Sequence, residues 1–316
     1  MVDNSIKVGF CVAYDWGFLA EALPLVYHFA DTICLSVDSE SYSWANQSFD
    51  WDEAGFMALI GKIDKAKKIK IYKHNFHLIE LTALQNEVRQ RNLMAVAMGK
   101  GGWHIQLDCD EYFVDFEKFV DYLKHLPDYS YTFNVSCIFI TLFKKGNNGF
   151  LYVCPEKSHQ IEHFQVATRY PHYEHGRRNG FFNVHSNFLI IHQSWARNKE
   201  EIKQKLLNWG HVNDFNVHAY FQFWESVGFD NYQGFANFHP MTPESWPTLK
   251  FIESRTTADL ISAFHQQGFP TLNRFERFLK NSRIFSKINS LVRSTFRKIS
   301  SGQPLKWLNK MISAKR

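Results

Sequence analysis

Two aspartates with a single residue between them, Asp108 and Asp110, follow an apolar run over 103–107. Such a run predicts a buried strand with side chains that alternate between faces, so we expect both carboxylates on one face and Cys109 pointing into the protein. Neighbouring carboxylates repel each other unless a cation lies between them. Because Mg²⁺ and Mn²⁺ prefer oxygen ligands and keep positions for phosphate oxygens, the spacing predicts a divalent cation site that holds a nucleotide diphosphate.

Two other kinds of carboxylate site fit this segment less well. An EF-hand loop needs oxygen ligands at its first, third and fifth positions followed by glycine, but here Tyr112 and Phe113 occupy the last two places. A phosphatase that forms an aspartyl-phosphate carries its Asp-x-Asp after the first strand, whereas roughly a third of the 316 residues precede Asp108. The calcium loop is therefore excluded and the phosphatase is disfavoured.

The elements that must position these carboxylates alternate between strands and helices. Apolar runs over 6–13 and 32–37 predict strands, and the segment between them, 18–29, predicts a helix. Further predicted elements are helices over 80–98 and 116–126 and a strand over 131–143. This order favours a parallel sheet with ligand groups at the carboxyl ends of its strands, so the predicted fold class is α/β, a Rossmann-like mixed sheet flanked by helices.

Polar residues also follow the other predicted strands. Ala13, Asp15 and Asp38 come at the ends of the first two strands, where a base and a ribose would bind, although ordinary turn formation explains them equally well. The apolar run 188–191 places His192 at a strand end and makes it the best third metal ligand. Asn198 is the expected cap of the helix that follows. The basic residues that either meet phosphate oxygens or face solvent are Arg197, Lys203 and Lys205.

The composition describes a globular protein. With 316 residues, 37.2 kDa and 45% hydrophobic residues, the chain can form one large α/β domain or two small ones. The sequence contains no apolar stretch of about 18 residues and no signal-peptide pattern at its N-terminus, so we expect a cytoplasmic protein. Five widely spaced cysteines without a Cys-x-x-Cys pair are expected to be buried free thiols.

The end of the chain differs from the rest in charge. Residues 274–316 contain 12 Lys/Arg and one acidic residue, a local charge of +11, and since the whole chain carries +5, the rest carries −6. Apolar residues recur at helical spacing over 274–299, and Gly302 and Pro304 separate them from a second short helix over 305–312. We predict a catalytic domain over 1–270 and a basic amphipathic helical tail over 271–316. The tail either contacts a membrane surface or packs on the domain, and a nucleic-acid partner is not expected.

The pair Arg91-Asn92 and the segment 101–111 resemble the signature of family-2-like glycosyltransferases with the GT-A fold, in which Arg-Asn on a helix precedes a strand that ends in the DxD motif. The segment 192–197, with Glu201, Ile202 and Lys205 after it, is similar to the later segment that supplies a histidine ligand in related bacterial enzymes. Together these motifs cover about residues 6–215. The resemblance implies a GT-A type nucleotide-diphospho-sugar transferase fold.

The resemblance also implies roles for single residues. Ala13, Asp15 and Asp38 would hold the nucleoside, Arg91 the diphosphate side, Asp108 the ribose or the metal, and Asp110 and His192 the metal, which is Mn²⁺ or Mg²⁺. The sequence departs from the family pattern at two places. Ser39-Glu40 follow Asp38 where many members have Asp-Gly-Ser after the strand, and no Glu-Asp pair stands where inverting members keep their base. The base candidates that remain are Glu174, Glu162, His211 and Asp214.

The expected activity is transfer of a sugar from a nucleotide-diphosphate donor to a hydroxyl group of a saccharide or lipid-linked acceptor. Such an enzyme would serve bacterial surface polysaccharide or glycolipid assembly, as a peripheral protein on the inner face of the cytoplasmic membrane. Two alternatives stay open. The same carboxylates would suit a metal-dependent nucleotidyl or phosphoryl transferase, and the chain would also suit a non-catalytic module that binds a nucleotide sugar or a carbohydrate at a membrane.

Overall fold

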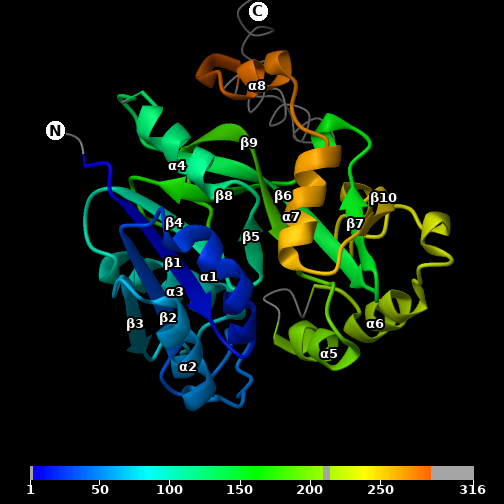
Figure 1. Ribbon diagram of the computed structural model, residues 1–316, viewed down its shortest axis with the longest axis horizontal. Helices are drawn as coiled ribbons and strands as arrows, with labels where there is room; N and C mark the ends of the chain where they lie inside the picture. Colours follow the sequence, from blue (N-terminus) through cyan, green and yellow to red (C-terminus); the bar gives the residue numbers. More distant parts are fainter. Residues whose placement is uncertain (1–2, 128, 209–213, 286–316) are drawn as a thin grey trace, which may run out of the picture. The chain divides into compact units, whose positions relative to one another are not determined.

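A computed structural model describes residues 3–127, 129–208 and 214–285 (Figure 1). The chain divides into two compact units, Met1–Thr271 and Leu272–Arg316. The strands of the first unit are β1 (Ile6–Val12), β2 (Thr32–Asp38), β3 (Ile69–His74), β4 (Trp103–Asp108), β5 (Glu111–Phe113), β6 (Phe133–Lys145), β7 (Gly149–Cys154), β8 (His163–Thr168), β9 (Phe182–His192) and β10 (Thr248–Glu253). Its helices are α1 (Leu19–Tyr27), α2 (Glu53–Ile63), α3 (Ala83–Ala97), α4 (Phe116–His125), α5 (Lys199–Asn208), α6 (Val217–Ser226) and α7 (Thr257–Gln267).

Within the described residues the strands form one mixed sheet in the order β10-β7-β6-β8-β4-β1-β2-β3. The strands β3, β2, β1 and β4 are parallel, whereas β8 runs antiparallel to both β4 and β6. The strand β9 lies off this path, parallel to β6 and antiparallel to β5. This confirms the predicted α/β class, a Rossmann-like mixed sheet flanked by helices.

Helices cover both faces of the parallel strands. On one face Phe10, Leu35 and Leu107 share an apolar core with Leu19 and Leu23 of α1. In Figure 1 this helix lies in front of the sheet and α3 lies behind it. Alternate residues of a strand face opposite sides of the sheet. The strand residues next to Phe10, Leu35 and Leu107 therefore face α3.

The packing against α3 is close. Cys11 and Cys34 form a small core with Met94 and Met98. Gly9 lies under the same helix, where a Cβ atom would come within 2.8 Å of the Met98 sulfur and 2.9 Å of the Met94 sulfur. All five cysteines are buried and free, as the sequence predicted.

A second, aromatic core lies beyond β6. Trp195, Trp224 and Trp246 pack with apolar residues of β7, α5 and α6, including Ile202 and Leu206 on α5. The Trp195 and Trp246 rings are edge to face with centroids 6.1 Å apart. This core fixes α5 beside the end of β9, where its polar side chains reach the carboxylates described below.

The sequence placed most of these elements correctly. The predicted helices over 18–29, 80–98 and 116–126 correspond to α1, α3 and α4, and the strand over 131–143 corresponds to β6. Asn198 caps α5 as expected, since its side chain accepts the N–H of Glu201. One local expectation is corrected: Cys109 and Asp110 form a turn between β4 and β5, so the strand alternation ends at Asp108.

The second unit is described only over 272–285. It contains the helix α8 (Arg274–Lys280), whose N-terminus carries a capping box made by Asn273 and Glu276. The remainder of the predicted amphipathic tail, 286–316, lies outside the described residues. In the described part of the chain, no helix combines the length and the apolar character that a membrane crossing requires.

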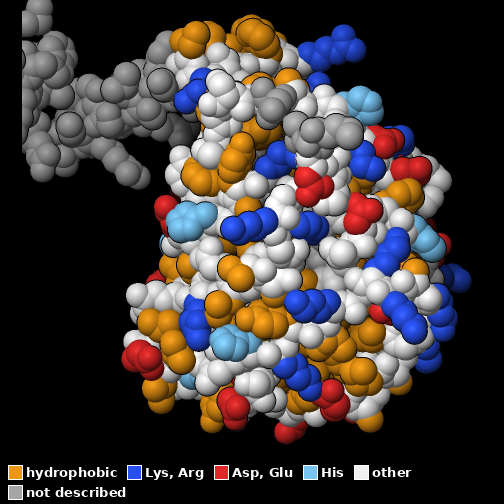
Figure 2. All heavy atoms as spheres, turned by 90° about the vertical axis from the view of Figure 1, so that its left-hand side faces the viewer, with side chains coloured by type: hydrophobic (Ala, Val, Ile, Leu, Met, Phe, Trp, Pro, Cys, Tyr) orange, Lys and Arg blue, Asp and Glu red, His pale blue; other side chains and the backbone are white. Residues whose placement is uncertain are grey.

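Figure 2 shows the surface that lies on the left of Figure 1. On this face Lys and Arg side chains are interspersed with hydrophobic and acidic ones. Positive charge on this side of the molecule is therefore spread out and does not form one stripe.

The β7–β10 edge offers a test of the sheet order. A Cβ atom on Gly149 would lie 2.1 Å from the backbone oxygen of Ile252 on β10, while one on Gly61 of α2 would meet nothing within 4 Å. We expect Gly149→Ala to lower the free energy of unfolding by about 1–3 kcal/mol through overpacking. Gly61→Ala, the matched control, should raise it by up to about 1 kcal/mol through helix propensity. Urea unfolding followed by circular dichroism measures both, and equal stability of the two variants would contradict the pairing.

Candidate functional site

The carboxyl ends of three parallel strands meet at one edge of the sheet. Asp15 follows β1, Asp38 ends β2 and Asp108 ends β4. This edge is where ligands bind in open α/β sheets. Solvent reaches 20% of the Asp15 side chain and 29% of the Asp108 side chain, so both carboxylates are accessible although protein surrounds them.

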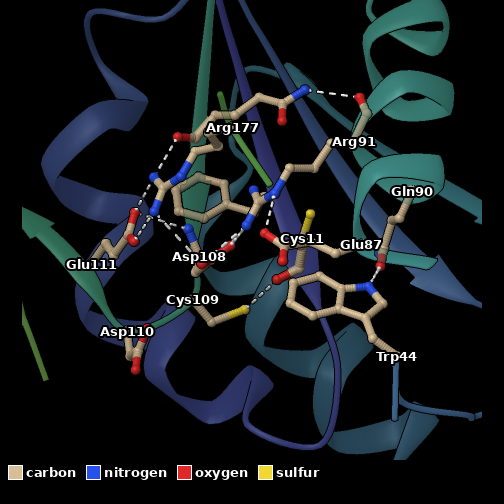
Figure 3. Close-up of polar contacts among 12 residues, drawn as sticks. Cys11, Trp44, Glu87, Gln90, Arg91, Asp108, Cys109, Asp110, Glu111 and Arg177 are labelled. Atoms are coloured by element: carbon tan, nitrogen blue, oxygen red, sulfur yellow. Dashed lines mark hydrogen bonds and ion pairs between the residues drawn. The ribbon is translucent and has the colours of Figure 1, made fainter. Parts of the chain in front are cut away.

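Asp108 lies between two arginines (Figure 3). Nη2 of Arg91 donates to both of its oxygens, at 2.9 and 3.2 Å, and Nη2 of Arg177 lies 3.7 Å from Oδ2. Burial opposes ionisation of this carboxyl group, but Arg91 and Arg177 outweigh burial and hold its pKa below the usual value. Arg91 is itself buried and donates through Nε to Glu87, one turn earlier on α3. Its position is therefore fixed by protein carboxylates.

Glu111 completes the same group. It is buried, and both of its carboxylate oxygens accept hydrogen bonds from Arg177, which also donates to the backbone oxygen of Gln106 at 3.0 Å. The Glu111 carboxylate accepts the backbone N–H of Asp108 as well, at 3.1 Å. Burial raises the pKa of Glu111 to about 7 in spite of Arg177. Glu111 and Arg177 thus brace the turn that presents Asp108.

Asp110 belongs to a second ionic group. Its side chain points away from the Arg91–Asp108–Arg177 group in Figure 3. Nη2 of Arg197 donates to Asp110 and also to Asp15, the latter at 2.9 Å, and Nζ of Lys205 lies 3.6 Å from Asp110 Oδ2. Burial opposes ionisation of Asp110, but Lys205, His192 and Arg197 hold its pKa well below the usual value. The two carboxylates of the Asp-x-Asp therefore have separate cationic partners.

His192 reaches this second group through strand pairing. In the antiparallel β5–β9 ladder it lies opposite Glu111, and the Asp110 carbonyl accepts the N–H of Gln193 at 2.9 Å. This brings His192 Nε2 to 3.6 Å from Asp110 Oδ1. Burial lowers the pKa of His192 to about 4, although Asp110 opposes the shift, so the imidazole is neutral near pH 7. A neutral imidazole is the form that binds metals.

The predicted metal ligands come together only in part. Among the residues that the structure describes, no three His, Cys, Asp or Glu side chains form a group that could hold a metal ion. Asp110 and His192 form a pair of donors, whereas Asp108 is bound by guanidinium groups. The physical reason is the turn at 109–110, which separates the two aspartates. A cation here would depend on Asp110, His192, phosphate oxygens and water, a donor set that Mg²⁺ accepts because it is often bound by one or two carboxylates plus substrate phosphates.

Asp38 binds backbone groups of two loops. One of its oxygens accepts the N–H groups of Glu40 and Tyr42, and the other accepts those of Phe76 and His77, at 2.8–3.1 Å. A carboxylate has about four lone-pair sites, so these bonds fill its capacity. Asp38 organises the loops after β2 and β3, and its contact with a nucleoside stays a prediction.

Ala13 also lies in a turn. Its carbonyl accepts the N–H of Trp16 at 3.1 Å, which closes the turn between β1 and the short helix Trp16–Phe18. The turn orients the following Asp15 toward Arg197. The nucleoside role of Ala13 likewise stays a prediction.

The four base candidates lie in different settings. Glu174 has an exposed side chain 3.5 Å from that of His172, Asp214 is exposed, and His211 lies outside the described residues. Glu162 is partly buried, immediately before β8, and accepts hydrogen bonds from Thr141 and Trp246. Of the candidates that the structure describes, Glu162 alone is held by neutral donors inside the fold.

Sequence reasoning missed two residues of the site, Arg177 and Glu111. Arg177 lies in the irregular segment between β8 and β9, where no periodicity marks it, and its contact with Glu111 spans 66 residues. The sequence did place Glu111 beside the Asp-x-Asp. Its position directly before Tyr112 and Phe113 indicated that this third carboxylate would be buried. A buried carboxylate needs a cation, which had to come from another part of the chain.

A separate cavity of about 580 Å³ lies at the other end of the sheet. It is lined by residues of β7, β10 and the 232–235 segment, among them Tyr232, Phe235 and Lys250. None of the predicted site residues lines it. We place the chemistry at the carboxylate edge, because ionic groups with shifted pKa values converge there.

The Arg177–Glu111 pair makes a testable contribution to stability. We expect Arg177→Met to lower the free energy of unfolding by about 3–5 kcal/mol near neutral pH, because Glu111 stays buried without its cation. The deficit should shrink at pH 5, since a protonated Glu111 carries no charge. Urea unfolding at both pH values measures the effect, with Arg177→Met/Glu111→Gln as the compensated variant. An Arg177→Met protein as stable as the wild type would refute the assignment.

Comparisons with known proteins add little to this geometry. No protein-family model matches the chain, and no curated protein matches it. A crystal structure of S. aureus TarS 1–349 is similar over 46% of this chain and 37% of that chain, with 13% identity and a TM-score of 0.27. Another structure of S. aureus TarS is similar over 45% of this chain and 23% of that chain, with 13% identity and a TM-score of 0.29. This chain thus spans well under half of either structure, and similarity at these scores assigns neither a family nor an activity to it.

Proposed function

We propose that this protein is a glycosyltransferase that moves a sugar from a nucleotide-diphosphate donor to a hydroxyl acceptor. The observation that carries the proposal is the convergence of Asp108, Asp110 and His192 with Arg197 and Lys205 at the carboxyl edge of the sheet. The Arg-Asn, Asp-x-Asp and histidine motifs that led to the sequence-based proposal all contribute residues to this edge.

Breaking the bond between the sugar and the diphosphate places negative charge on the leaving group. Lys205 suits stabilisation of that charge, because its side chain is only 14% exposed and its Nζ lies 3.6 Å from Asp110 Oδ2. Arg197 adds a buried guanidinium whose Nε and Nη1 atoms have no hydrogen-bond partner in the described structure. Fixed cations in a site of low polarity stabilise developing charge without reorganisation of solvent.

A divalent cation, Mn²⁺ or Mg²⁺, remains part of the proposal. Asp110 and His192 would hold it, and it would act as a Lewis acid on the departing diphosphate. Arg91 would then keep the Asp108 carboxylate oriented toward the ribose or the cation. These roles follow the family resemblance, and the contacts described above support them.

The acceptor is a saccharide or a lipid-linked saccharide in this proposal. The predicted setting is bacterial surface polysaccharide or glycolipid assembly at the inner face of the cytoplasmic membrane. The contact with the membrane depends on the basic tail, most of which lies outside the described residues. A nucleotidyl or phosphoryl transferase and a non-catalytic nucleotide-sugar binding module remain the alternatives, since both would use the same anion-binding edge.

Product analysis separates these functions. We expect the wild-type protein with Mn²⁺ and a panel of nucleotide sugars to release free nucleotide diphosphate. Asp110→Asn should reduce turnover by roughly 10²-fold or more, the scale of losing one preorganised electrostatic contact. The variant should stay folded because Arg197 keeps its bond to Asp15. Chromatography of the nucleotides and thermal unfolding measure both effects.

The exposed Asp121 on α4 supplies the matched control, and Asp121→Asn should turn over like the wild type. Release of pyrophosphate or nucleoside monophosphate would favour the nucleotidyl or phosphoryl transferase. Binding without turnover would favour the binding module. Full activity of Asp110→Asn would count against the proposed site.

The cation can be tested without turnover. We expect the wild-type protein to bind Mn²⁺ in the presence of a nucleoside diphosphate, and His192→Ala to weaken that binding about 10-fold or more through loss of one donor. Electron paramagnetic resonance of free Mn²⁺ measures the bound fraction. Replacement of the partly exposed His28, which lies at the end of α1, by Ala provides the control. Equal Mn²⁺ binding by the wild type and His192→Ala would remove His192 from the ligand set.

A further inference from the structure

Glu162 is held in one orientation by two neutral donors. The Thr141 hydroxyl donates to its Oε2 atom and the Trp246 indole N–H donates to its Oε1 atom, both at 3.0 Å. Its backbone carbonyl accepts the N–H of Phe139 at 2.9 Å, which ties the residue to β6. The residue as a whole is partly exposed.

Glu162 differs from the carboxylates of the sheet edge in its electrostatics. Asp15, Asp108, Asp110 and Glu111 each form a salt bridge with an arginine, which stabilises the anion and engages its oxygens. In the described structure no salt bridge reaches Glu162. Burial raises its pKa, and the bonds from Trp246 and Thr141 offset this only in part. Among the described residues its oxygens are therefore bound only by neutral donors.

Strand register connects Glu162 to the candidate site. Thr141 of β6 is the direct partner of His192 in the parallel β6–β9 pairing. Phe139 lies two residues earlier on the same face of β6, with its ring 5.8 Å from that of His192 and under the Arg177 guanidinium. Thr141 thus connects His192, its strand partner, to Glu162, to which its hydroxyl donates.

In the described part of the chain, none of the titratable groups on the surrounding elements forms a hydrogen bond or ion pair with the Glu162 carboxylate. His163 follows it on β8 and stacks edge to face on His185, with ring centroids 4.9 Å apart. The His239 ring packs against the ring of Trp246, with centroids 4.5 Å apart. His192 is the strand partner of Thr141, and the Arg177 guanidinium lies over the Phe139 ring.

We infer that Glu162 is the general base of the transfer reaction, oriented by Thr141 and Trp246 as positioning residues. The inference rests on the proposed function and narrows the four sequence candidates to one. In a single displacement the acceptor oxygen forms a bond to the anomeric carbon while the bond from that carbon to the diphosphate oxygen breaks. The bonding electron pair leaves with the diphosphate, and the acceptor proton moves to a Glu162 oxygen and then to solvent.

The central test compares Glu162→Gln with the wild type. Glutamine keeps the size of the side chain but cannot accept the proton, so we expect kcat to fall by about 10²–10⁴-fold, the usual contribution of a general base. The KM for the donor should change less than about threefold, because the base acts on the acceptor hydroxyl. Glu162→Asp should recover part of kcat. The exposed Glu156 in the same segment gives the control, and Glu156→Gln should retain wild-type kcat.

The positioning residues give a second readout, which does not depend on how Glu162→Gln folds. Trp246→Phe and Thr141→Val each remove a donor that stabilises the carboxylate, so the pKa of Glu162 should rise. Since the base acts in its ionised form, activity lost on acidification should begin at a higher pH in both variants. The pH profile of kcat measures this, and a purely structural role would leave the profile in place.

These outcomes distinguish failure of the base assignment from failure of the proposed function. Wild-type protein that releases nucleotide diphosphate while Glu162→Gln keeps kcat within about threefold would overturn the base assignment alone. An unchanged acidic limb in both positioning variants would do the same. Wild-type protein that releases no nucleotide diphosphate from any donor would overturn the proposed function, and the base assignment with it.

Discussion

The candidate site depends on the neutralisation of buried carboxylates by cations that come from distant parts of the chain. Moving an ion out of water costs several kcal/mol, and a well-placed partner must recover that cost. Asp108 and Glu111 obtain their partners from α3 and from the segment between β8 and β9, while Asp15 and Asp110 share Arg197 just before α5. Five sequence regions are thereby held at one edge of the sheet.

This arrangement divides the edge into two chemical environments. The carboxylates paired with arginine have their oxygens engaged by guanidinium groups, and they serve to orient groups or bind a cation. Glu162 has hydroxyl and indole partners instead, and it keeps its ability to take up a proton. The separation of fixed charge from proton transfer is what a reaction with an anionic leaving group and a neutral acceptor requires.

The sequence predicted much of the fold, because the signals were local. Hydrophobic periodicity located β1, β2 and β6 and the helices α1, α3 and α4, and the Asn198 cap followed from residue type alone. The strand end at Asp108 and its placement beside the end of β1 followed from the rule that parallel strands end at one edge. These inferences needed no information about contacts between distant residues.

The parts that sequence reasoning could not reach depend on long-range contacts. The turn at 109–110 broke the strand alternation that was expected to bring Asp108 and Asp110 together. Arg177 meets Glu111 across 66 residues, and Trp246 meets Glu162 across 84. Asp38 accepts four backbone N–H groups that only the folded loops bring to it.

The short strand β5 has a consequence for how such a protein can diversify. Three residues pair it with the end of β9, and in the turn before it Asp110 accepts a hydrogen bond from Arg197. Inserting or deleting one residue between Asp108 and Glu111 would exchange the two faces of β5 and undo both ion-paired groups at once. Variation in length is tolerated more readily in the connection 155–161, which contributes no ion pair to either group in the described structure. Changes of length among descendants of this fold would therefore concentrate in that connection, while the spacing of the acidic segment stays constant.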